Sequence, residues 1–277
     1  MGEHDGRVAL VTGASQGIGR AAALALAHQG SAVVVHGLTE DLAAQVADMI
    51  LGNGGRAVAS SGPIDDPQTS RSAVEAALEH FGRLDTLVTS AGIQRYGDVP
   101  STSEETWDEV FNVNVKGVFL AASLALPYLR QADAGSIVIV ASVQATATQK
   151  RVAAYTASKG ALLSLARSMA VDEAEHGVRV NSVSPGSVDT PLLRAAAAGF
   201  SGGVADRAEQ ILAEWGAGHP LGRIAHASEV GEVISFLASP RASFVTGTDV
   251  RVDGGLLAQL GAPIPREDHP DESGREA

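Results

Sequence analysis

The chain has 277 residues, of which 45% are hydrophobic, and this is enough for one large α/β domain with a well-buried core. Its formal net charge of −12 argues against a nucleic-acid partner, because phosphate backbones are bound by basic faces. The chain has no Cys, so disulfides, thiolate metal ligands and a cysteine nucleophile are excluded.

We expect neither a membrane segment nor an export signal. No apolar run approaches the roughly 18–20 residues of a membrane span. Residues 1–6 contain neither a basic segment nor an apolar signal core. We therefore predict a cytoplasmic protein with no metal site and with neither a nucleic acid nor a membrane as partner.

Short β-branched runs alternate with Ala- and Leu-rich stretches from the N-terminus onward. The first predicted elements are a strand at 8–12, a helix at 18–29, a strand at 32–36, a helix at 39–51, a strand at 56–60 and a helix at 67–80. They are followed by a strand at 84–89, a helix at 103–131, a strand at 136–141, a helix at 152–176, a strand at 178–183, a helix at 228–237 and a strand at 249–252. This repetition without a linker predicts a single doubly wound, Rossmann-like α/β domain over 1–261. Its seven-stranded parallel sheet would be flanked by helices on both faces.

The region 191–220 is the least regular part of the pattern, and it follows the sixth predicted strand. Sheets of this kind bind ligands at the carboxyl ends of their strands. We therefore interpret the region as a lid over the substrate; an ordinary surface insertion is the alternative. Residues 262–277 are rich in Pro and acidic residues, and we expect them to be disordered.

Tyr155 and Lys159 are four residues apart in the predicted helix 152–176, so their side chains share one face. A free phenol has a pKa of about 10 and is a poor acid–base catalyst at neutral pH. We expect the Lys159 ammonium to stabilise the phenolate and lower the Tyr155 pKa, so that the phenol can exchange a proton with an alcohol or carbonyl oxygen. Hydride chemistry on a nicotinamide needs such a proton partner.

A glycine-rich turn with Gly13, Gly17 and Gly19 lies between the first predicted strand and its helix. Such a turn lets backbone approach a pyrophosphate at the positive end of a helix. Taken alone it could be a simple tight turn. Its place in a β-α-β unit and the downstream Tyr155–Lys159 pair favour a dinucleotide site.

Together these residues resemble the short-chain dehydrogenase/reductase family, in its compact single-domain branch, over residues 6 to about 260. Ser142 lies 13 residues before Tyr155, a separation that also fits the family. The further matches are the Thr-Gly-x-x-x-Gly-x-Gly turn at 12–19, Val113 with Asn114, the Tyr-x-x-x-Lys motif at 155–159, Asn181 with Pro185 and Gly186, Thr246 with Gly247, and Asp-Gly-Gly at 253–255. The resemblance implies an NAD- or NADP-dependent oxidoreductase that transfers a hydride between the nicotinamide and a secondary alcohol or carbonyl.

The resemblance also implies residue roles. Tyr155 would be the general acid or base, and Ser142 would hydrogen-bond the reacting oxygen. Lys159 would hold the nicotinamide ribose and lower the Tyr155 pKa, and Asn114 would anchor a water that links Lys159 to solvent. The residues expected at the dinucleotide are Gly13, Ser15, Gln16, Gly17, Ile18, Gly19, Gly37, Leu38, Ile64, Ala91, Gly92, Tyr155, Lys159, Pro185, Gly186, Val188 and Thr190.

The choice between the two dinucleotides stays open at this point. Relatives that prefer NAD often have an Asp at the end of the second strand, where this chain has Gly37. Relatives that prefer NADP often have Arg or Lys at the positions of Gln16 or Leu38. We expect the neighbouring His36 to be structural.

Substrate contacts are expected from Ser142 and Tyr155 together with Gln94, Arg95, Gln144 and Arg151. Gln149 and Lys150 are expected as further pocket walls, and the lid would add Leu192, Leu193 and Trp215. A polar pocket must pair its buried groups, so we favour a sugar or polyol substrate, as in a sugar 1-dehydrogenase. If these side chains point to solvent, an apolar ketone, including a 3-oxoacyl or steroid compound, is the alternative.

Three other functions are disfavoured. A non-catalytic dinucleotide sensor would not need the Tyr155–Lys159 pair. A sugar-nucleotide epimerase or dehydratase would be longer, with a different glycine spacing. Nothing in the sequence indicates a purely structural protein. By resemblance we expect a homotetramer whose interfaces pair the helices predicted at 103–131 and 152–176.

Overall fold

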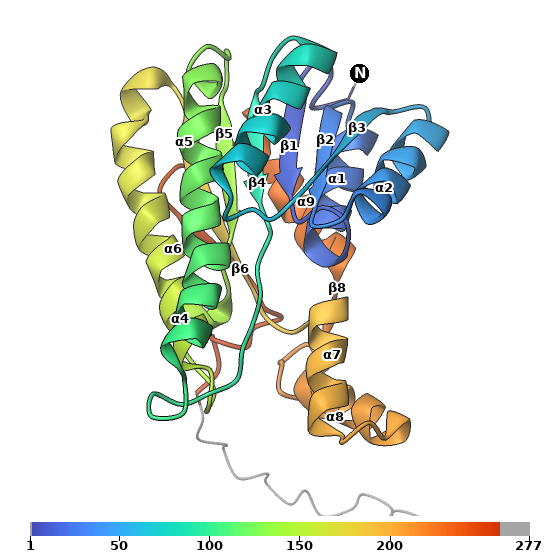
Figure 1. The fold of residues 1–277 in the computed structure, drawn as a ribbon, viewed down its shortest axis with the longest axis vertical. Helices are drawn as coiled ribbons and strands as arrows, with labels where there is room; N and C mark the ends of the chain where they lie inside the picture. The colour runs from blue at the N-terminus through green and yellow to red at the C-terminus, as the bar shows by residue number, and fades with distance from the viewer. Residues whose placement is uncertain (1, 261–277) are drawn as a thin grey trace, which may run out of the picture.

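The chain is described from a computed structural model, which covers residues 2–260. The sequence predictions for residues 1 and 261, and for the acidic tail at 262–277, lie outside the described residues. The helices and strands carry the labels of Figure 1.

Seven parallel strands form one sheet, as predicted. They are β1 (Val8–Thr12), β2 (Ala32–Gly37), β3 (Arg56–Ser61), β4 (Thr86–Thr89), β5 (Ser136–Val140), β6 (Arg179–Pro185) and β9 (Asp249–Val252). Their order in the sheet is β3-β2-β1-β4-β5-β6-β9. After β3 the chain crosses to the other half of the sheet, so that β4 lies beside β1 and the strand order reverses between these two strands. In a doubly wound sheet this is the switch point beside which ligands bind.

Two helix layers cover the sheet, and alternate residues of each strand face opposite layers (Figure 1). Ala9 and Val11 of β1 belong to the core with α1 (Gly17–His28), α2 (Glu40–Gly52) and α9 (Ala227–Ala238). Val8 and Leu10 belong to the other core, with α3 (Pro67–Phe81), α5 (Gly117–Leu129) and α6 (Ala153–Asp172). Burial of both faces explains why the strands read as nearly continuous apolar runs. The predicted Rossmann-like fold is confirmed.

The helix predicted at 103–131 is interrupted by a π-helical turn. It consists of α4 (Glu104–Phe111), the π turn Asn112–Lys116 and α5. The combined helix Glu104–Leu129 is long and apolar enough to cross a membrane, with a mean hydropathy of 1.4 over its most apolar window, of which 39% is buried. Lys116 interrupts its apolar run, which explains why the sequence does not predict a membrane segment here. The helix packs against α3 and α6 in the folded domain.

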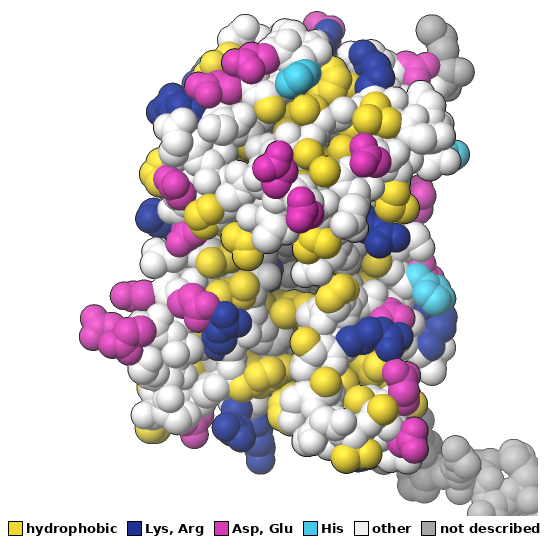
Figure 2. Space-filling model, turned by 45° about the vertical axis from the view of Figure 1, so that its right-hand side comes forward, with side chains coloured by type: hydrophobic (Ala, Val, Ile, Leu, Met, Phe, Trp, Pro, Cys, Tyr) yellow, Lys and Arg dark blue, Asp and Glu magenta, His cyan; other side chains and the backbone are white. Residues whose placement is uncertain are grey.

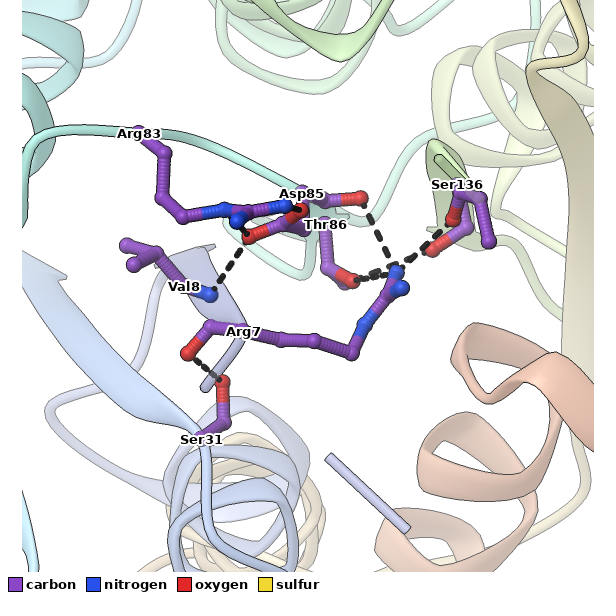
Figure 3. Close-up of polar contacts among 8 residues, drawn as sticks. Arg7, Val8, Ser31, Arg83, Asp85, Thr86 and Ser136 are labelled. Atoms are coloured by element: carbon purple, nitrogen blue, oxygen red, sulfur yellow. Dashed lines mark hydrogen bonds and ion pairs between the residues drawn. The ribbon is translucent and has the colours of Figure 1, made fainter. Parts of the chain in front are cut away.

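Asp85 links the amino ends of β1 and β4 (Figure 3). These ends lie opposite the carboxyl ends of the strands, where ligands are expected to bind. It is fully buried, and its carboxylate accepts hydrogen bonds from the Val8 N–H at 2.9 Å and from Arg83 Nε at 2.9 Å. Arg7 extends to the Ala134 carbonyl oxygen at 2.8 Å. This cluster therefore holds the amino ends of the central strands, away from their carboxyl ends.

The region 191–220, expected to be irregular, is largely helical, so that expectation is wrong. It contains α7 (Pro191–Phe200) and α8 (Ala205–Ala217), and its base is a pair of two-residue strands, β7 (Val188–Asp189) and β8 (Ala225–His226). The two helices pack on each other through a small cluster of their own, in which Ala197, Ile211 and Leu212 are buried. In Figure 1 they stand apart from the two layers, beyond one end of the sheet. We call residues 191–217 the lid.

Candidate active site

A cleft of about 630 Å³ opens at the carboxyl ends of the strands, between the sheet and the lid. Its floor includes Val140, Ala141 and Ser142 at the end of β5, and its far wall includes Leu192 and Trp215 of the lid. Figure 2 shows the hollow on this face, bordered mainly by hydrophobic side chains. The cleft thus lies where the doubly wound topology predicts a ligand site.

Tyr155 and Lys159 occupy the first two turns of α6, and both line the cleft. Lys159 Nζ lies 5.6 Å from the centre of the Tyr155 ring and donates a hydrogen bond to the Val140 carbonyl oxygen at 2.9 Å. The four-residue spacing read from the sequence therefore brings the ammonium beside the phenol.

Burial governs the ionisation of both side chains. Tyr155 is 8% exposed, and burial raises its pKa to about 12, while a hydrogen bond with the Ser142 hydroxyl lowers it by less. Lys159 is 5% exposed, and burial lowers its pKa to about 8. The predicted lowering of the Tyr155 pKa by Lys159 is therefore wrong for this structure, because burial has the largest effect on that pKa and the Lys159 ammonium is not among the groups that shift it.

Ser142 follows β5 and begins a short 3-10 turn. Its backbone is extended, and its hydroxyl accepts a hydrogen bond from the Gln144 N–H at 3.1 Å. The side chain caps this turn and also lines the cleft beside Tyr155. The same hydroxyl can therefore be held in place by the backbone and offered to a ligand oxygen.

Asn114 sits in the π turn, where it is fully buried and does not line the cleft. Its Oδ1 accepts from the Ile93 N–H at 2.8 Å, and its Nδ2 donates to the Ile93 carbonyl oxygen at 2.9 Å and to Ser158 Oγ at 3.0 Å. Asn114 thus ties the segment after β4 to the helix that carries Tyr155 and Lys159. π turns often occur at functional sites, where they re-aim a side chain.

The glycine-rich turn fits a dinucleotide phosphate. Gly13 has a φ of +66°, and a Cβ there would lie 2.6 Å from the Ala91 backbone N; one on Gly19 would overlap the Gly13 carbonyl oxygen. Gln16 precedes α1 without a side-chain cap, and the first turn of α1 has no acidic residue. The first N–H groups of α1 are therefore left for phosphate oxygens of a ligand.

Most of the residues expected at the dinucleotide line this cleft. They are Gly13, Ser15, Gln16, Gly17, Ile18, Leu38, Ile64, Ala91, Gly92, Tyr155, Lys159, Pro185, Gly186, Val188 and Thr190. Gly19 and Gly37 do not line it. Instead they allow close packing of the turn, since a Cβ on Gly37 would lie 2.9 Å from the Ser15 Cβ.

His36 lines the cleft, contrary to the expectation of a purely structural residue. It is 2% exposed, and neither ring nitrogen has a partner with hydrogen-bond geometry among residues 2–260. Burial lowers its pKa to about 4, and the nearby Gly62 backbone opposes this by less. His36 is therefore a neutral polar group at the end of β2, available to a ligand.

Two of the expected substrate residues point elsewhere. Arg95 does not line the cleft, because its guanidinium pairs with Glu109 at 2.9 and 2.5 Å. Arg151 is exposed with a φ of +64°, and its carbonyl oxygen accepts from the Gly97 N–H at 2.8 Å. Lys150 is likewise exposed outside the cleft. The predicted cationic side of the substrate pocket is wrong.

The other expected walls do line the cleft: Gln94, Gln144, Gln149, Leu192, Leu193 and Trp215. Several walls were missed, among them Tyr96, Leu256 and Leu257. Tyr96 packs edge-on against Phe200 of the lid at 5.0 Å, and Phe200 packs edge-on against Trp215 at 6.3 Å. Leu256 and Leu257 directly follow the Asp-Gly-Gly motif, and this position is the signal that could have indicated them.

Within residues 2–260, no group of three or more His, Asp or Glu side chains is arranged to hold a metal ion. Lys159 is the one cation among the described residues that line the cleft. The chemistry available there consists of two phenols, an ammonium, an imidazole, a carboxylate, hydroxyls and amides.

Comparison with known proteins adds four similarities. A family described as "Enoyl-(Acyl carrier protein) reductase" matches residues 13–257. Cyclohexanol dehydrogenase of Acinetobacter sp. (strain SE19) is 38% identical over 260 residues, which cover 93% of this chain and 97% of that protein. The ligand-free structure of aldohexose dehydrogenase from Thermoplasma acidophilum is 35% identical with a TM-score of 0.86, covering 95% of this chain and 98% of its own. A short-chain type dehydrogenase/reductase from Mycobacterium marinum is 33% identical with a TM-score of 0.85, covering 92% and 97%.

Proposed function

The chain belongs to the short-chain dehydrogenase/reductase family of oxidoreductases, and on this basis we propose that its cleft interconverts a secondary alcohol and the corresponding carbonyl compound. The observation that carries the proposal is the meeting of Tyr155, Ser142 and Lys159 at the buried floor of one cleft. A nicotinamide dinucleotide bound in the cleft supplies or takes up the hydride.

Tyr155 is the proposed proton partner. As a neutral phenol with a pKa of about 12, it can donate its proton to a carbonyl oxygen that is being reduced. In the opposite direction its phenolate takes the proton of the alcohol and becomes the neutral phenol again. The Lys159 ammonium, beside the ring, favours the phenolate whenever the proton has left. Ser142 positions the reacting oxygen, and Asn114 fixes the backbone around Lys159.

The glycine turn and the first turn of α1 are proposed to hold the pyrophosphate, and the residues of the sequence prediction that line the cleft are proposed to hold the rest of the dinucleotide. The adenosine end is formed by Leu38, His36 and Ile64 with their neighbours. Gly19 and Gly37 act indirectly, by letting the turn pack closely.

We propose that the enzyme prefers NAD(H) over NADP(H). The end of β2 offers Leu38 and the neutral His36, and the charged residue that lines this end of the cleft is Asp65. A 2′-phosphate would therefore find a carboxylate and no cation there, which disfavours it.

Leu38→Arg tests this preference. Leu38 is 71% exposed, so an arginine fits without repacking, and charge-assisted hydrogen bonds to the phosphate should tighten NADPH binding by about 10–100-fold. Leu38→Gln, polar but uncharged, is the matched control. If the unmodified protein binds NADPH more tightly than NADH in a fluorescence titration, the proposed preference is wrong.

For the substrate we propose a neutral ring alcohol, with a sugar or polyol favoured. Gln94, Gln144 and Gln149 line the cleft, and Gln144 Oε1 is buried without a partner, so a substrate hydroxyl can donate to it. Two similar proteins are named for cyclohexanol and for an aldohexose. The apolar walls at Tyr96 and Leu257 favour a second candidate, a cyclic ketone without further hydroxyls.

The experiment follows nicotinamide absorbance with a panel of aldohexoses, polyols, cyclohexanols and ketones. Tyr155→Phe should reduce turnover by about 10²–10⁴-fold while leaving NADH binding within about twofold, since it removes only the proton partner. Unchanged turnover would refute the assignment. Activity on apolar ketones alone would select the second candidate.

We further propose that residues 1–261 form one dinucleotide-binding and catalytic domain in a cytoplasmic homotetramer. Support for the assembly comes from apolar side chains left exposed on α4, α5 and α6. These are Trp107 (39% exposed), Phe119 (56%) and Val171 (77%). Sedimentation at micromolar concentration tests the tetramer.

A further inference from the structure

His219 lies immediately beyond the lid, where the chain returns from α8 to the body of the protein. It is 5% exposed, although neither its sequence position nor a motif marks it as functional. Each of its two ring nitrogens makes one hydrogen bond, and the two partners belong to different walls of the cleft.

The two hydrogen bonds fix the protonation of the ring. The backbone N–H of Ser187 can only donate, and it lies 3.1 Å from His219 Nε2, so Nε2 must be an unprotonated acceptor. The ring hydrogen then sits on Nδ1, which donates to the Trp215 carbonyl oxygen at 2.8 Å. Only the neutral ring with its hydrogen on Nδ1 makes both contacts.

The ring fits a space shaped for it. A Cβ on Gly186 would lie 2.7 Å from His219 Nε2, so the glycine of the Pro185–Gly186 pair admits the imidazole. Behind the ring is a cavity of about 80 Å³, lined in part by Asp253, Arg223 and Glu229. These are the charged groups that face His219.

Both carboxylates behind the ring have other partners. Glu229 pairs with Arg223 at 2.7 Å. The Asp253 carboxylate accepts from the backbone N–H groups of Gly255 and Leu257. Neither is hydrogen-bonded to His219, whose two contacts are both to backbone atoms of the cleft walls.

We infer that His219 is a positioning residue that latches the lid to the loop after β6 and so sets the closed form of the cleft. Ser187 and Trp215 both line the cleft, the first beside the proposed nicotinamide position and the second on the substrate side. The latch joins the two walls through one ring. The expected change in KM rests on the proposed function. The contact of His219 with Ser187 and Trp215 does not, because it can be tested without turnover.

Loss of either contact should weaken substrate binding, because the ring then no longer holds the two walls of the cleft together.

Three substitutions separate the two contacts. His219→Gln can place an amide oxygen near the position of Nε2 and keep the acceptor for Ser187. His219→Asn can place an amide nitrogen near Nδ1 and keep the donor for Trp215, but it loses the Ser187 acceptor. His219→Phe keeps the ring shape and loses both contacts. His176→Gln, on the exposed turn after α6, is the matched control for the loss of a histidine.

We expect His219→Asn and His219→Phe to raise the alcohol KM by about tenfold with kcat within about threefold, as for the loss of one hydrogen bond. His219→Gln should keep a KM near that of the unmodified enzyme, because it keeps the acceptor for the Ser187 N–H. Chymotrypsin should cut after the half-exposed Phe200 at the lid tip faster in the Asn and Phe variants. This cleavage is measured by mass spectrometry and needs no turnover.

The latch would be overturned if the Gln and Asn variants had equal KM values and equal cleavage rates. It would also be overturned if the substitutions lowered the Tm but changed neither the KM nor the cleavage rate. If the Asn and Phe variants do not fold, Gly186→Ala replaces them, and a KM and a cleavage rate equal to those of the unmodified enzyme overturn the latch. Tyr155→Phe separates the two proposals, because turnover in that variant refutes the chemistry, while lid cleavage in the His219 series still decides the latch.

Discussion

Replacing Lys159 by Met should stabilise the cofactor-free protein while abolishing its activity. Lys159 is 5% exposed, and burial lowers the pKa of its ammonium to about 8, against a model-peptide value of 10.5. Between these two values the unfolded chain holds a proton that the folded protein has lost. The free energy of unfolding therefore rises with pH across this window and is lowest where both states are protonated.

The size of the effect follows from the two pKa values. A difference of about 2.5 units corresponds to about 3.4 kcal/mol, nearly all of which is present at pH 7. At pH 10 about 0.8 kcal/mol remains, because the unfolded state is then also losing its proton. Methionine avoids this cost but gives up the hydrogen bond from Nζ to the Val140 carbonyl oxygen, which is worth about 1–3 kcal/mol. The variant should therefore gain about 1–2 kcal/mol at pH 7.

Urea unfolding at pH 7 and pH 10, analysed by linear extrapolation, measures this difference. The advantage of Lys159→Met over the unmodified protein should fall by about 2.5 kcal/mol between the two pH values. Lys116→Met, on the same chain but at an exposed position, should show no such fall. If the advantage of Lys159→Met is the same at both pH values, the ammonium is not desolvated and the reasoning about Tyr155 and Lys159 fails with it.

The remaining predictions concern three other sites. Asp85→Asn should lower the free energy of unfolding by about 2 kcal/mol, because it removes the charged acceptor of Arg83, and should leave KM unchanged, as measured by urea unfolding and steady-state kinetics. Gly186→Ala should raise KM in the manner of His219→Asn, because its methyl group would displace the ring; an unchanged KM would contradict the packing. Arg95→Ala should leave KM within about twofold and the free energy of unfolding within about 0.5 kcal/mol, since an exposed ion pair contributes little. A large rise in KM would mean that Arg95 contacts the substrate after all.

The sheet and the meeting of Tyr155 with Lys159 could be predicted from the sequence, because both depend on residues that lie close together in the chain. Parallel strands buried on both faces have a recognisable apolar run, and β1 and β9 were predicted with their observed bounds. A four-residue spacing in a helix places Tyr155 and Lys159 together whatever the rest of the chain does. The glycine turn likewise depends on a neighbouring strand and helix.

The errors concern features that tertiary contacts decide. The Arg95 guanidinium pairs with Glu109, fourteen residues away. The sequence does not indicate whether this guanidinium faces solvent, the substrate or a carboxylate. The lid helices were missed because Gly199, Gly202 and Gly203 break the region, although each helix is amphipathic and contributes to a small cluster of its own. The sequence placed an ammonium near Tyr155 but gave no measure of how completely both groups leave water.

Several buried polar groups gather at the cleft, and some of them lack a hydrogen-bond partner within residues 2–260. His36 has two unpaired ring nitrogens, Gln144 Oε1 is unpaired, and Lys159 is held largely out of water. Each lowers the stability of the free protein, since buried polar groups are normally satisfied. A ligand that pairs with them recovers this free energy on binding, and one that cannot leaves it unrecovered. Discrimination against the wrong dinucleotide or alcohol can therefore come from groups that weaken the empty cleft, because the cost of leaving them unpaired is what separates one ligand from another.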